Sequence, residues 1–464
     1  MKKTSIGKIE VSLPYRKKNV IMQVSLIVKK RRMDEMKKKA LEVLLNKEFS
    51  EIKKLNRVVM DSRKLEANDV FWAIRGGNIF VKEALSKGVE LVISDDKTYE
   101  NLEKVIVVED TVEFMQKWSK KYLELLNIFV VGITGSNGKT STKDIIFEFL
   151  SLYKTGKKTE GNYNNHIGLP FTVLNLEESD EFVVLEMGMS GFGEIELLSD
   201  IAKPNYGVIT NIGDSHLEFM KTRENIFKAK TEIISHVKDE LIVNGDDPFL
   251  KETTGIKIGF EEGNTYQIIV EDTCSKGTKF KVKKDDLEYN LETNLLGNHN
   301  LYNLTMAFAL IDKLDYHKEK TIEKAKNLHL TKMRFEKIEK GQHIYINDAY
   351  NASPISMNFA LDTFEGLYKE IKKVAVLGDM LELGEKSKEL HENLYEKLID
   401  SDLYKVYLYG NEMKNLYEKF EGNNKVVHFA DKKSIINEIK SITEPCAILL
   451  KGSRGMKLEE IIEE

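Results

Sequence analysis

The chain is 464 residues long, and charged residues make up 31% and apolar residues 41% of it. Such a chain is expected to be globular and to form about three domains of typical size. The net charge of −5, with both signs interspersed, provides no basic field and excludes nucleic acid as an expected partner. Cys274 and Cys446 lie far apart without metal-ligand spacing, which favours reduced thiols and predicts a cytoplasmic protein.

Residues 1–32 are basic and contain one apolar run, Val20–Val28. This run of about nine residues is too short to span a bilayer, which takes roughly 20. Lysine and arginine follow it, where a signal peptide would have a small-residue cleavage site. We therefore expect no membrane span here and predict a non-essential basic extension.

Short apolar runs alternate with helical patterns over residues 33–126, which predicts a small α/β domain. The runs begin at Val58, Asp69, Leu91 and Val105. Ser62 and Arg63 lie in a polar turn between two of them and are candidates for holding a phosphorylated or sugar-nucleotide ligand. An ordinary surface loop explains the same pair equally well.

Residues Ile128–Ile133 have the pattern of a buried strand, Thr134–Gly138 that of a glycine-containing turn, and the residues from Thr140 onward that of an amphipathic helix. Glycines let backbone N–H groups converge on an anion, and the helix N-terminus adds its positive dipole end. In such a loop Lys139 can reach the terminal phosphates, and Thr140 can offer its hydroxyl to Mg²⁺. Ile133 stands where a strict P-loop has its first glycine. We predict a nucleoside-triphosphate loop, and the alternative is a tight turn with a surface lysine. Its expected ligand-binding residues are Gly135, Ser136, Asn137, Gly138, Lys139, Thr140 and Ser141.

Polar side chains follow the next predicted strands, where the carboxyl ends of parallel strands collect ligands. Glu186 ends one strand and His216 follows another. Together with Thr140 they predict a Mg²⁺ site at this edge of the sheet. The alternative is that both residues are solvated and bind no metal ion. Asn164 and Asn165 are candidates for hydrogen bonds to sugar, uracil or phosphate groups.

The remaining pattern completes a central domain over residues 127–331 and predicts a third domain over residues 332–464. Residues 266–296 alternate as antiparallel strands do, and Asn300 and Asn303 share one face of the helix that follows. After residue 332, strands and helices alternate again, as in a doubly wound, Rossmann-like domain. The predicted fold class is therefore α/β with three domains.

These motifs, taken in order, give the chain from about residue 55 onward a resemblance to a known family. They are GITGSNGKTS at Gly132, GNYNNHIGLP at Gly161, TNIGDSH ending at His216, KAKTEI around Lys230, GNHNLYN at Gly297, DAYNASP at Asp348, VLGDMLELGE at Val376 and KGSRGMKLE at Lys451. The chain resembles the Mur ligases, ATP-dependent amide-forming enzymes of peptidoglycan synthesis, and within them the MurF type, to which the last two motifs point. The resemblance implies ATP and Mg²⁺ as cofactors, UDP-MurNAc-tripeptide and D-Ala-D-Ala as substrates, and a monomer.

The resemblance also implies roles for individual residues. Lys139 would hold the β- and γ-phosphates, Thr140 and Glu186 one Mg²⁺, and His216 with a carbamylated Lys230 a second. By itself, the predicted helix over Arg223–Ile234 has the pattern of a solvated face, with Lys228, Lys230 and Glu232 on it. Asn300 and Asn303 would face the adenine side, and Arg334 and Asp348 would reach ATP from the linker and the third domain. In the first domain a D-G-H stretch usual in the family is replaced by residues 77–80, an apparently shortened loop, which affects how the uridine end is held. A folylpolyglutamate-synthetase-like ligase and a non-enzymatic ATP-binding regulator are the alternatives.

Overall fold

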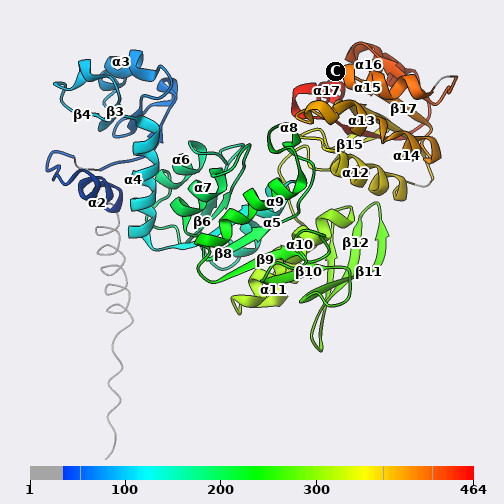
Figure 1. The fold of residues 1–464 in the computed structure, drawn as a ribbon, viewed down its shortest axis with the longest axis horizontal. Coiled ribbons are helices and arrows are strands. Elements are labelled where there is room, and N and C mark those ends of the chain that lie inside the picture. The colour runs from blue at the N-terminus through cyan, green and yellow to red at the C-terminus, as the bar shows by residue number, and fades with distance from the viewer. Residues whose placement is uncertain (1–34, 53, 369, 421, 464) are drawn as a thin grey trace, which may run out of the picture. The chain divides into compact units, whose positions relative to one another are not determined.

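The computed structural model describes residues 35–52, 54–368, 370–420 and 422–463. The predicted extension over residues 1–32 lies outside this range. Three α/β sheets form, in agreement with the predicted fold class (Figure 1). The chain divides into two compact units: one runs to Asn127 and includes Val173–Ser179, and the other comprises Ile128–Thr172 and Asp180–Glu464. The domain boundary predicted near residue 332 falls inside the second unit and stays a prediction.

The first unit contains a four-stranded parallel sheet in the order β1-β2-β3-β4. Its strands and helices are β1 (Val58–Val59), β2 (Val70–Trp72), β3 (Leu91–Ser94), β4 (Val105–Val107), α2 (Met36–Leu45), α3 (Val81–Ser86) and α4 (Thr111–Leu126). Trp72 and Trp118 are fully buried and lie 5.7 Å apart between ring centroids, and each indole N–H donates to a backbone carbonyl. Helix α4 begins where the Asp110 carboxylate accepts backbone N–H groups and ends at Asn127 in the left-handed conformation.

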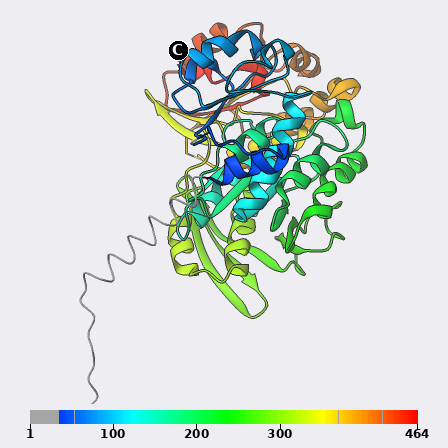
Figure 2. The same cartoon turned by 90° about the vertical axis from the view of Figure 1, so that its left-hand side faces the viewer.

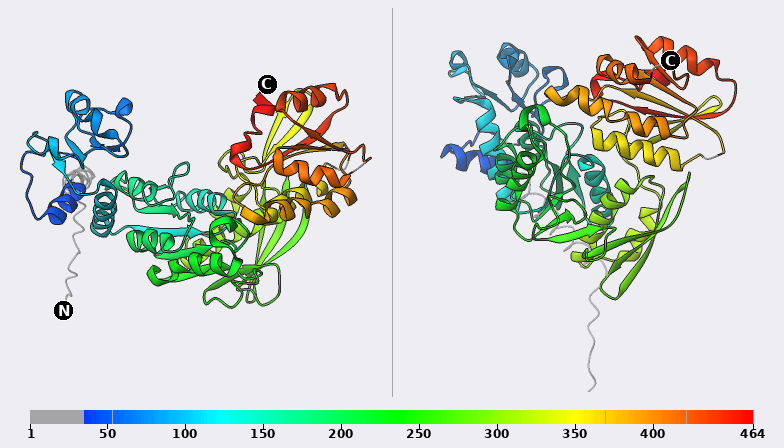
Figure 3. Two further views of the ribbon diagram at one scale, coloured as in Figure 1. Left: turned by 45° about the horizontal axis from the view of Figure 1, so that its top comes forward. Right: turned by 45° about the vertical axis from the view of Figure 1, so that its right-hand side comes forward.

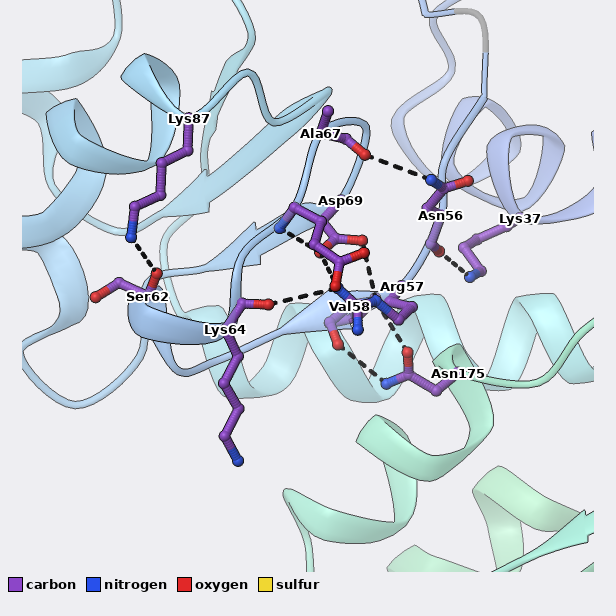
Figure 4. A network of polar contacts seen from close by, with 11 residues as sticks. Lys37, Asn56, Arg57, Val58, Ser62, Lys64, Ala67, Asp69, Lys87 and Asn175 are labelled. Carbon is purple, nitrogen blue, oxygen red and sulfur yellow. Dashed lines mark hydrogen bonds and ion pairs between the residues drawn. The ribbon is translucent and has the colours of Figure 1, made fainter.

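A polar network holds the strand ends of this sheet, as Figure 4 shows. Arg57 donates two hydrogen bonds to the buried Asp69 carboxylate, whose oxygen also accepts from the Glu66 backbone N–H. The Asn175 side chain both donates to and accepts from the Val58 backbone, which ties residues 173–179 to this unit.

The second unit contains a nine-stranded sheet in the order β13-β12-β11-β10-β9-β8-β5-β7-β6. Strands β5 to β11 are parallel to one another, whereas β12 and β13 extend the sheet as an antiparallel ribbon, which can be followed in Figure 2. The strands are β5 (Phe129–Thr134), β6 (Gly156–Lys158), β7 (Phe182–Glu186), β8 (Tyr206–Ile209), β9 (Glu240–Asn244), β10 (Ile256–Gly259), β11 (Tyr266–Cys274), β12 (Gly277–Lys284) and β13 (Leu287–Thr293). The helices are α5 (Lys139–Leu150), α6 (Gly168–Leu174), α7 (Glu194–Ala202), α8 (Leu217–Met220), α9 (Arg223–Thr231), α10 (Asn298–Lys313) and α11 (Lys318–Ala325).

The same unit contains a six-stranded sheet in the order β14-β15-β19-β16-β17-β18, parallel except for β14. Helices cover both of its faces (Figure 3) because side chains alternate along each strand: Ala375 and Leu377 join one core, and Val374 and Val376 the other. The strands are β14 (Glu336–Lys340), β15 (His343–Asn347), β16 (Lys372–Gly378), β17 (Lys405–Tyr409), β18 (Val426–Phe429) and β19 (Cys446–Lys451). The helices are α12 (Pro354–Gly366), α13 (Ser387–Glu392), α14 (Tyr395–Asp400), α15 (Asn411–Tyr417), α16 (Lys432–Ser441) and α17 (Glu460–Glu463).

Both cysteines are free, with Cys446 buried and Cys274 exposed. Within the part of the chain that the structure describes, every helix is too short or too polar to cross a bilayer.

Candidate functional site

A cavity of about 700 Å³ opens at the carboxyl ends of β5, β7, β8 and β9 in the second unit. Parallel strands end at the same edge of a sheet, so loops far apart in sequence meet there. Residues following β15, β16 and β19 of the six-stranded sheet complete the wall. The predicted site residues that line it are Ser136, Asn137, Gly138, Lys139, Thr140, Ser141, Asn164, Asn165, Glu186, His216, Asn300, Asn303, Arg334 and Asp348.

The glycine loop between β5 and α5 has a geometry that only glycine fits. Gly135 has φ 145°, and a Cβ there would lie 1.9 Å from Thr210 Oγ1. Gly138 has φ 82°, and its Cβ would lie 2.7 Å from Asn303 Oδ1. Helix α5 begins at Lys139 without a side-chain cap, so its first backbone N–H groups remain for an anion.

Lys139 folds back over this loop, and its ammonium donates to the backbone carbonyls of Gly135 at 2.6 Å and Ser136 at 3.2 Å. Burial lowers the pKa of Lys139; Glu186 opposes this shift and Arg334 adds to it. Carbonyl oxygens are weak partners for an ammonium ion compared with phosphate oxygens. The lysine is therefore placed to exchange these bonds for those of a nucleotide.

Arg334 reaches the loop from the linker before β14. Its guanidinium donates to Thr140 Oγ1 at 2.9 Å and stacks over the Tyr350 ring at 4.0 Å. The Asp348 carboxylate, after β15, forms an ion pair with Lys451 at 2.8 Å and accepts from the Phe335 backbone N–H. Both predicted ATP contacts from this part of the chain thus lie in the cavity wall.

Glu186 is a buried carboxylate at the end of β7. Its Oε1 accepts a hydrogen bond from Asn164 Nδ2 at 2.9 Å. Its buried Oε2 has no hydrogen-bond donor among the described residues and lies 3.6 Å from the Lys143 ammonium. A buried carboxylate oxygen without a donor is costly, and a cation in the cavity would satisfy it. Glu186 and Thr140 are hard oxygen ligands of the kind that Mg²⁺ prefers.

His216 follows β8 and caps the short helix α8. Its Nδ1 lies 2.7 Å from Glu382 Oε2, but among the described residues this Nδ1 makes no hydrogen bond of acceptable geometry. Among residues 35–463, leaving aside the three internal positions not described, no three His, Cys, Asp or Glu side chains form a ready-made metal cluster.

Comparisons with known proteins decide the family. The Mur ligase middle domain family matches residues 133–311, and the family described as Mur ligase, glutamate ligase domain, matches residues 333–454. The UDP-N-acetylmuramoyl-tripeptide–D-alanyl-D-alanine ligase of Bacillus subtilis (strain 168) is 39% identical over 427 residues, which are 88% of this chain and 93% of that protein. The chain belongs to the Mur ligase family.

Two solved structures of the MurF type agree with the fold of this Mur ligase. MurF from Acinetobacter baumannii superposes with a TM-score of 0.82 at 26% identity, over 93% of this chain and 98% of that one. MurF from Thermotoga maritima, solved in complex with ADP, superposes with a TM-score of 0.79 at 31% identity, over 88% and 96% of the two chains.

Lys230, on α9 of this Mur ligase, is buried, although by itself the helix pattern indicated a solvated face. Its side chain is 1% exposed, whereas Lys228 is exposed, as expected for two residues about 200° apart around a helix. Burial, and the nearby positive charge of Lys139, lower the pKa of Lys230 well below its usual value. Lys230 is not among the residues that line the cavity.

Several predicted amides already have protein partners. Asn303 accepts from Thr142 Oγ1 and donates to Asn300 Oδ1, and Asn300 donates to the Leu296 carbonyl. Asn165 accepts from the backbone N–H groups of Ile167 and Gly168 at the start of α6. These contacts brace the loop and the helix start that form the wall of the cavity.

The structure keeps Ser62 and Arg63 in the first unit. The Ser62 side chain is buried and its carbonyl accepts from Lys87, while Arg63 is largely exposed and paired with Asp61 at 2.9 Å. The apparently shortened loop is a 3₁₀ turn, Gly77–Phe80, in which Asn78 donates to Asp95, accepts from Ser94 and, through its carbonyl, from Tyr99. The ligand role of Ser62 and Arg63 stays a prediction.

Sequence reasoning missed several residues of the cavity wall. His299 is one: burial lowers its pKa to about 4, and its buried Nδ1 has no hydrogen-bond partner. His299 lies inside the GNHNLYN motif, where the flanking asparagines have the clearer hydrogen-bonding pattern. Glu382, Lys451 and Arg454 also line the cavity and lie in the two motifs assigned to the MurF type.

Proposed function

We propose that this chain joins D-alanyl-D-alanine to UDP-MurNAc-tripeptide in peptidoglycan precursor synthesis, using ATP. Two observations together support the proposal. A ligase named for this reaction matches 88% of this chain, and one cavity is lined by the glycine loop, Glu186 and Arg334. A Mur ligase cavity of about 700 Å³ suits a nucleotide together with the reacting ends of two substrates.

The reaction needs two displacements, because a carboxylate is a poor acylating agent. The terminal carboxylate of the tripeptide attacks the γ-phosphorus of ATP, the bond to the β-phosphate oxygen breaks, and ADP leaves. The amine of D-Ala-D-Ala then attacks the acyl phosphate, phosphate departs with the C–O bond electrons, and the amine loses a proton. The net products are the UDP-MurNAc-pentapeptide, ADP and phosphate.

The protein's part in this chemistry is positioning and charge neutralisation. The uncapped start of α5 and Lys139 would bind the β- and γ-phosphates, and Arg334 would neutralise charge on the transferred phosphoryl group. Asp348 would bind the nucleotide from the six-stranded sheet, and Asn300 and Asn303 would support its adenine side. Enclosure by both sheets would keep water from the acyl phosphate.

The donor set of the wall fits Mg²⁺. Thr140 and Glu186 would hold one ion, and His216 with a carbamylated Lys230 a second. Bound there, Mg²⁺ supplies Lewis-acid neutralisation of phosphate charge. The buried Glu186 oxygen without a hydrogen-bond donor supports the first site, and the buried, neutral-favouring environment of Lys230 supports its carbamylation.

The proposal also covers the binding of the UDP end of the substrate, the roles of the three domains, the oligomeric state and the cellular location. Residues 33–126 would bind the UDP end with Ser62 and Arg63, and Asn164 and Asn165 would face the substrate in the central domain, residues 127–331. Residues 332–464 would serve as the ligase domain that receives the amine. We further propose a monomer that works in the cytoplasm, where ATP is available.

The test is mass spectrometry of the product formed from ATP, a panel of UDP-MurNAc-tripeptides and either D-Ala-D-Ala or glutamate. We expect a pentapeptide product with D-Ala-D-Ala, and phosphate release only when both substrates are present. Extension by glutamate would identify a folylpolyglutamate-synthetase-like ligase instead. ATP binding without any phosphate release would indicate a regulator.

A further inference from the structure

His216 and Glu382 meet from distant parts of the second unit. His216 ends the loop after β8, and Glu382 lies in the loop after β16 of the six-stranded sheet. Their side chains approach to 2.7 Å between Nδ1 and Oε2, and both line the cavity. Figure 1 shows α8, which His216 caps, next to the C-terminal sheet.

The backbone on both sides holds this approach. His216 has φ 65° and Glu382 has φ 63°, a left-handed conformation that non-glycine residues adopt at a cost. The Glu218 backbone N–H donates to the Glu382 carbonyl at 3.2 Å. Gly384, at φ 59°, packs so closely on Glu218 that a Cβ would lie 3.1 Å from its Cα. Strained backbone maintained by such contacts indicates that the placement of these two side chains matters.

The loop that carries His216 is also fixed from its own side. Arg223 donates two hydrogen bonds to the Asp214 carboxylate, at 2.6 and 2.5 Å, two residues before the histidine. The Gly213 backbone N–H donates to Ser136 Oγ at 2.8 Å, which ties the same loop to the glycine loop. The remaining freedom of the histidine is therefore mainly the rotation and protonation pattern of its ring.

A carboxylate that accepts a hydrogen bond from Nδ1 determines which ring nitrogen of His216 has the proton. Once aligned with Nδ1, it would favour the proton on that nitrogen, leave the lone pair on Nε2, and restrict rotation of the ring. Histidines that bind metal ions usually have such a carboxylate or carbonyl partner on the other nitrogen.

We propose that Glu382 is a positioning residue that orients His216 through Nδ1 and so presents Nε2 to the cavity. This inference rests on the proposed metal role of His216. Because Glu382 belongs to the six-stranded sheet, the metal-binding form of His216 depends on the docking of the Leu381–Gly384 loop against α8. A small rotation of the ring brings the two groups into line for a hydrogen bond.

The first test reads the histidine ring in the apo protein by ¹⁵N NMR, comparing Glu382→Ala with the matched control Glu385→Ala. Glu385 lies in the same loop, is exposed and lies outside the cavity wall. We expect the proton on Nδ1 in the wild type and in the control, and mainly on Nε2 in Glu382→Ala. The same ring pattern in all three proteins would overturn the proposal, and this readout needs neither nucleotide nor substrate, so it is independent of the proposed reaction.

The second test measures Mn²⁺ binding to the ADP complex by EPR, with Mn²⁺ as the probe for Mg²⁺. Loss of an outer carboxylate partner lowers metal affinity about 10- to 100-fold. We expect that loss in Glu382→Ala, a smaller loss in Glu382→Gln, which keeps a hydrogen-bond acceptor, and none in Glu385→Ala. A raised KM for D-Ala-D-Ala with unchanged Mn²⁺ affinity would show instead that Glu382 binds the amine substrate, and would overturn the proposal.

Discussion

Replacing Lys230 by methionine should make the apo protein more stable and the enzyme nearly inactive. The side chain is 1% exposed, and burial together with Lys139 lowers its pKa well below the usual value. Folding therefore disfavours the charged ammonium of Lys230, at a cost of about 1.4 kcal/mol for each unit by which its pKa is lowered. Methionine has a similar length without that cost, so the melting temperature should rise.

The pH dependence of this gain has a definite sign. Between the lowered pKa of Lys230 and about 10.4, the value of an unperturbed lysine, the unfolded chain binds more protons than the folded chain, so wild-type stability rises with pH. The advantage of Lys230→Met is therefore largest on the acidic side and vanishes above about 10.4. Thermal unfolding in CO₂-depleted buffer at several pH values measures it, with the exposed Lys228→Met as a control that should change little.

The catalytic half of the prediction rests on carbamylation. The neutral amine adds CO₂, which turns a buried cation into an anion suited to a metal ion. Loss of a group that stabilises transition-state charge typically costs about 10²- to 10³-fold in kcat, or about 2.7–4 kcal/mol. We expect this loss in Lys230→Ala, partial rescue by added formate or acetate, and near-normal turnover in Lys228→Ala.

Phosphate release coupled to product detection is the assay. Wild-type activity should also fall in CO₂-depleted buffer as the pH drops, because less neutral amine is available, and should recover on addition of bicarbonate. Full activity of Lys230→Ala, or an unmodified amine at this position in a well-resolved complex with ATP and Mg²⁺, would refute the carbamate.

Three further predictions concern the cavity wall. Lys139→Ala should lower turnover at least about 100-fold with the fold intact, because the phosphates lose their mobile cation; near-normal phosphate release by the folded variant would remove the nucleotide assignment. Glu186→Gln and His216→Ala should each raise the Mg²⁺ concentration needed for half-maximal activity at least about tenfold, and superimposable Mg²⁺ titrations would argue against their metal role. Gly138→Ala should weaken ATP binding measured by calorimetry, because its Cβ would lie 2.7 Å from Asn303 Oδ1 at φ 82°. The control is Gly263→Ala, at φ 93° with open space around it, which should cost about 1–2 kcal/mol of stability and leave ATP affinity unchanged. Equal ATP affinities for the two variants would contradict a role of Gly138 in nucleotide binding.

The elements around the glycine loop could be predicted because their periodicity is strong. The expected strand over Ile128–Ile133 and helix from Thr140 correspond to β5 and α5 within one residue at each start. The edge strands β6 and β14 were not predicted, because sequences such as Gly156-Lys-Lys are too polar to stand out. An edge strand needs burial on fewer sides than a central one, so its pattern is weak.

Residues of the candidate site could be predicted only where a local sequence motif was enough to identify them. Lys139, Glu186 and His216 each stand at the end of a recognisable strand or loop. Lys143 beside Glu186 and Glu382 beside His216 were not predicted, because both contacts arise from tertiary packing. The VLGDMLELGE motif that contains Glu382 indicates the family and carries no signal for its contact with His216. Lys230 shows the reverse: its helix pattern suggested solvent, and folding buries it.

Contacts from the C-terminal sheet and its linker reach three separate parts of the nucleotide wall. Arg334 donates to Thr140 at the start of α5, Ser353 Oγ donates to Asn137 Oδ1 at 3.2 Å in the glycine loop, and Glu382 approaches His216 after β8. Each contact orients a side chain proposed to bind nucleotide or metal. The acyl phosphate of the proposed reaction is sensitive to water. The reaction therefore benefits if these side chains reach their working arrangement only when the amine-binding part is docked. The intermediate then forms only where water is excluded and the amine is bound nearby.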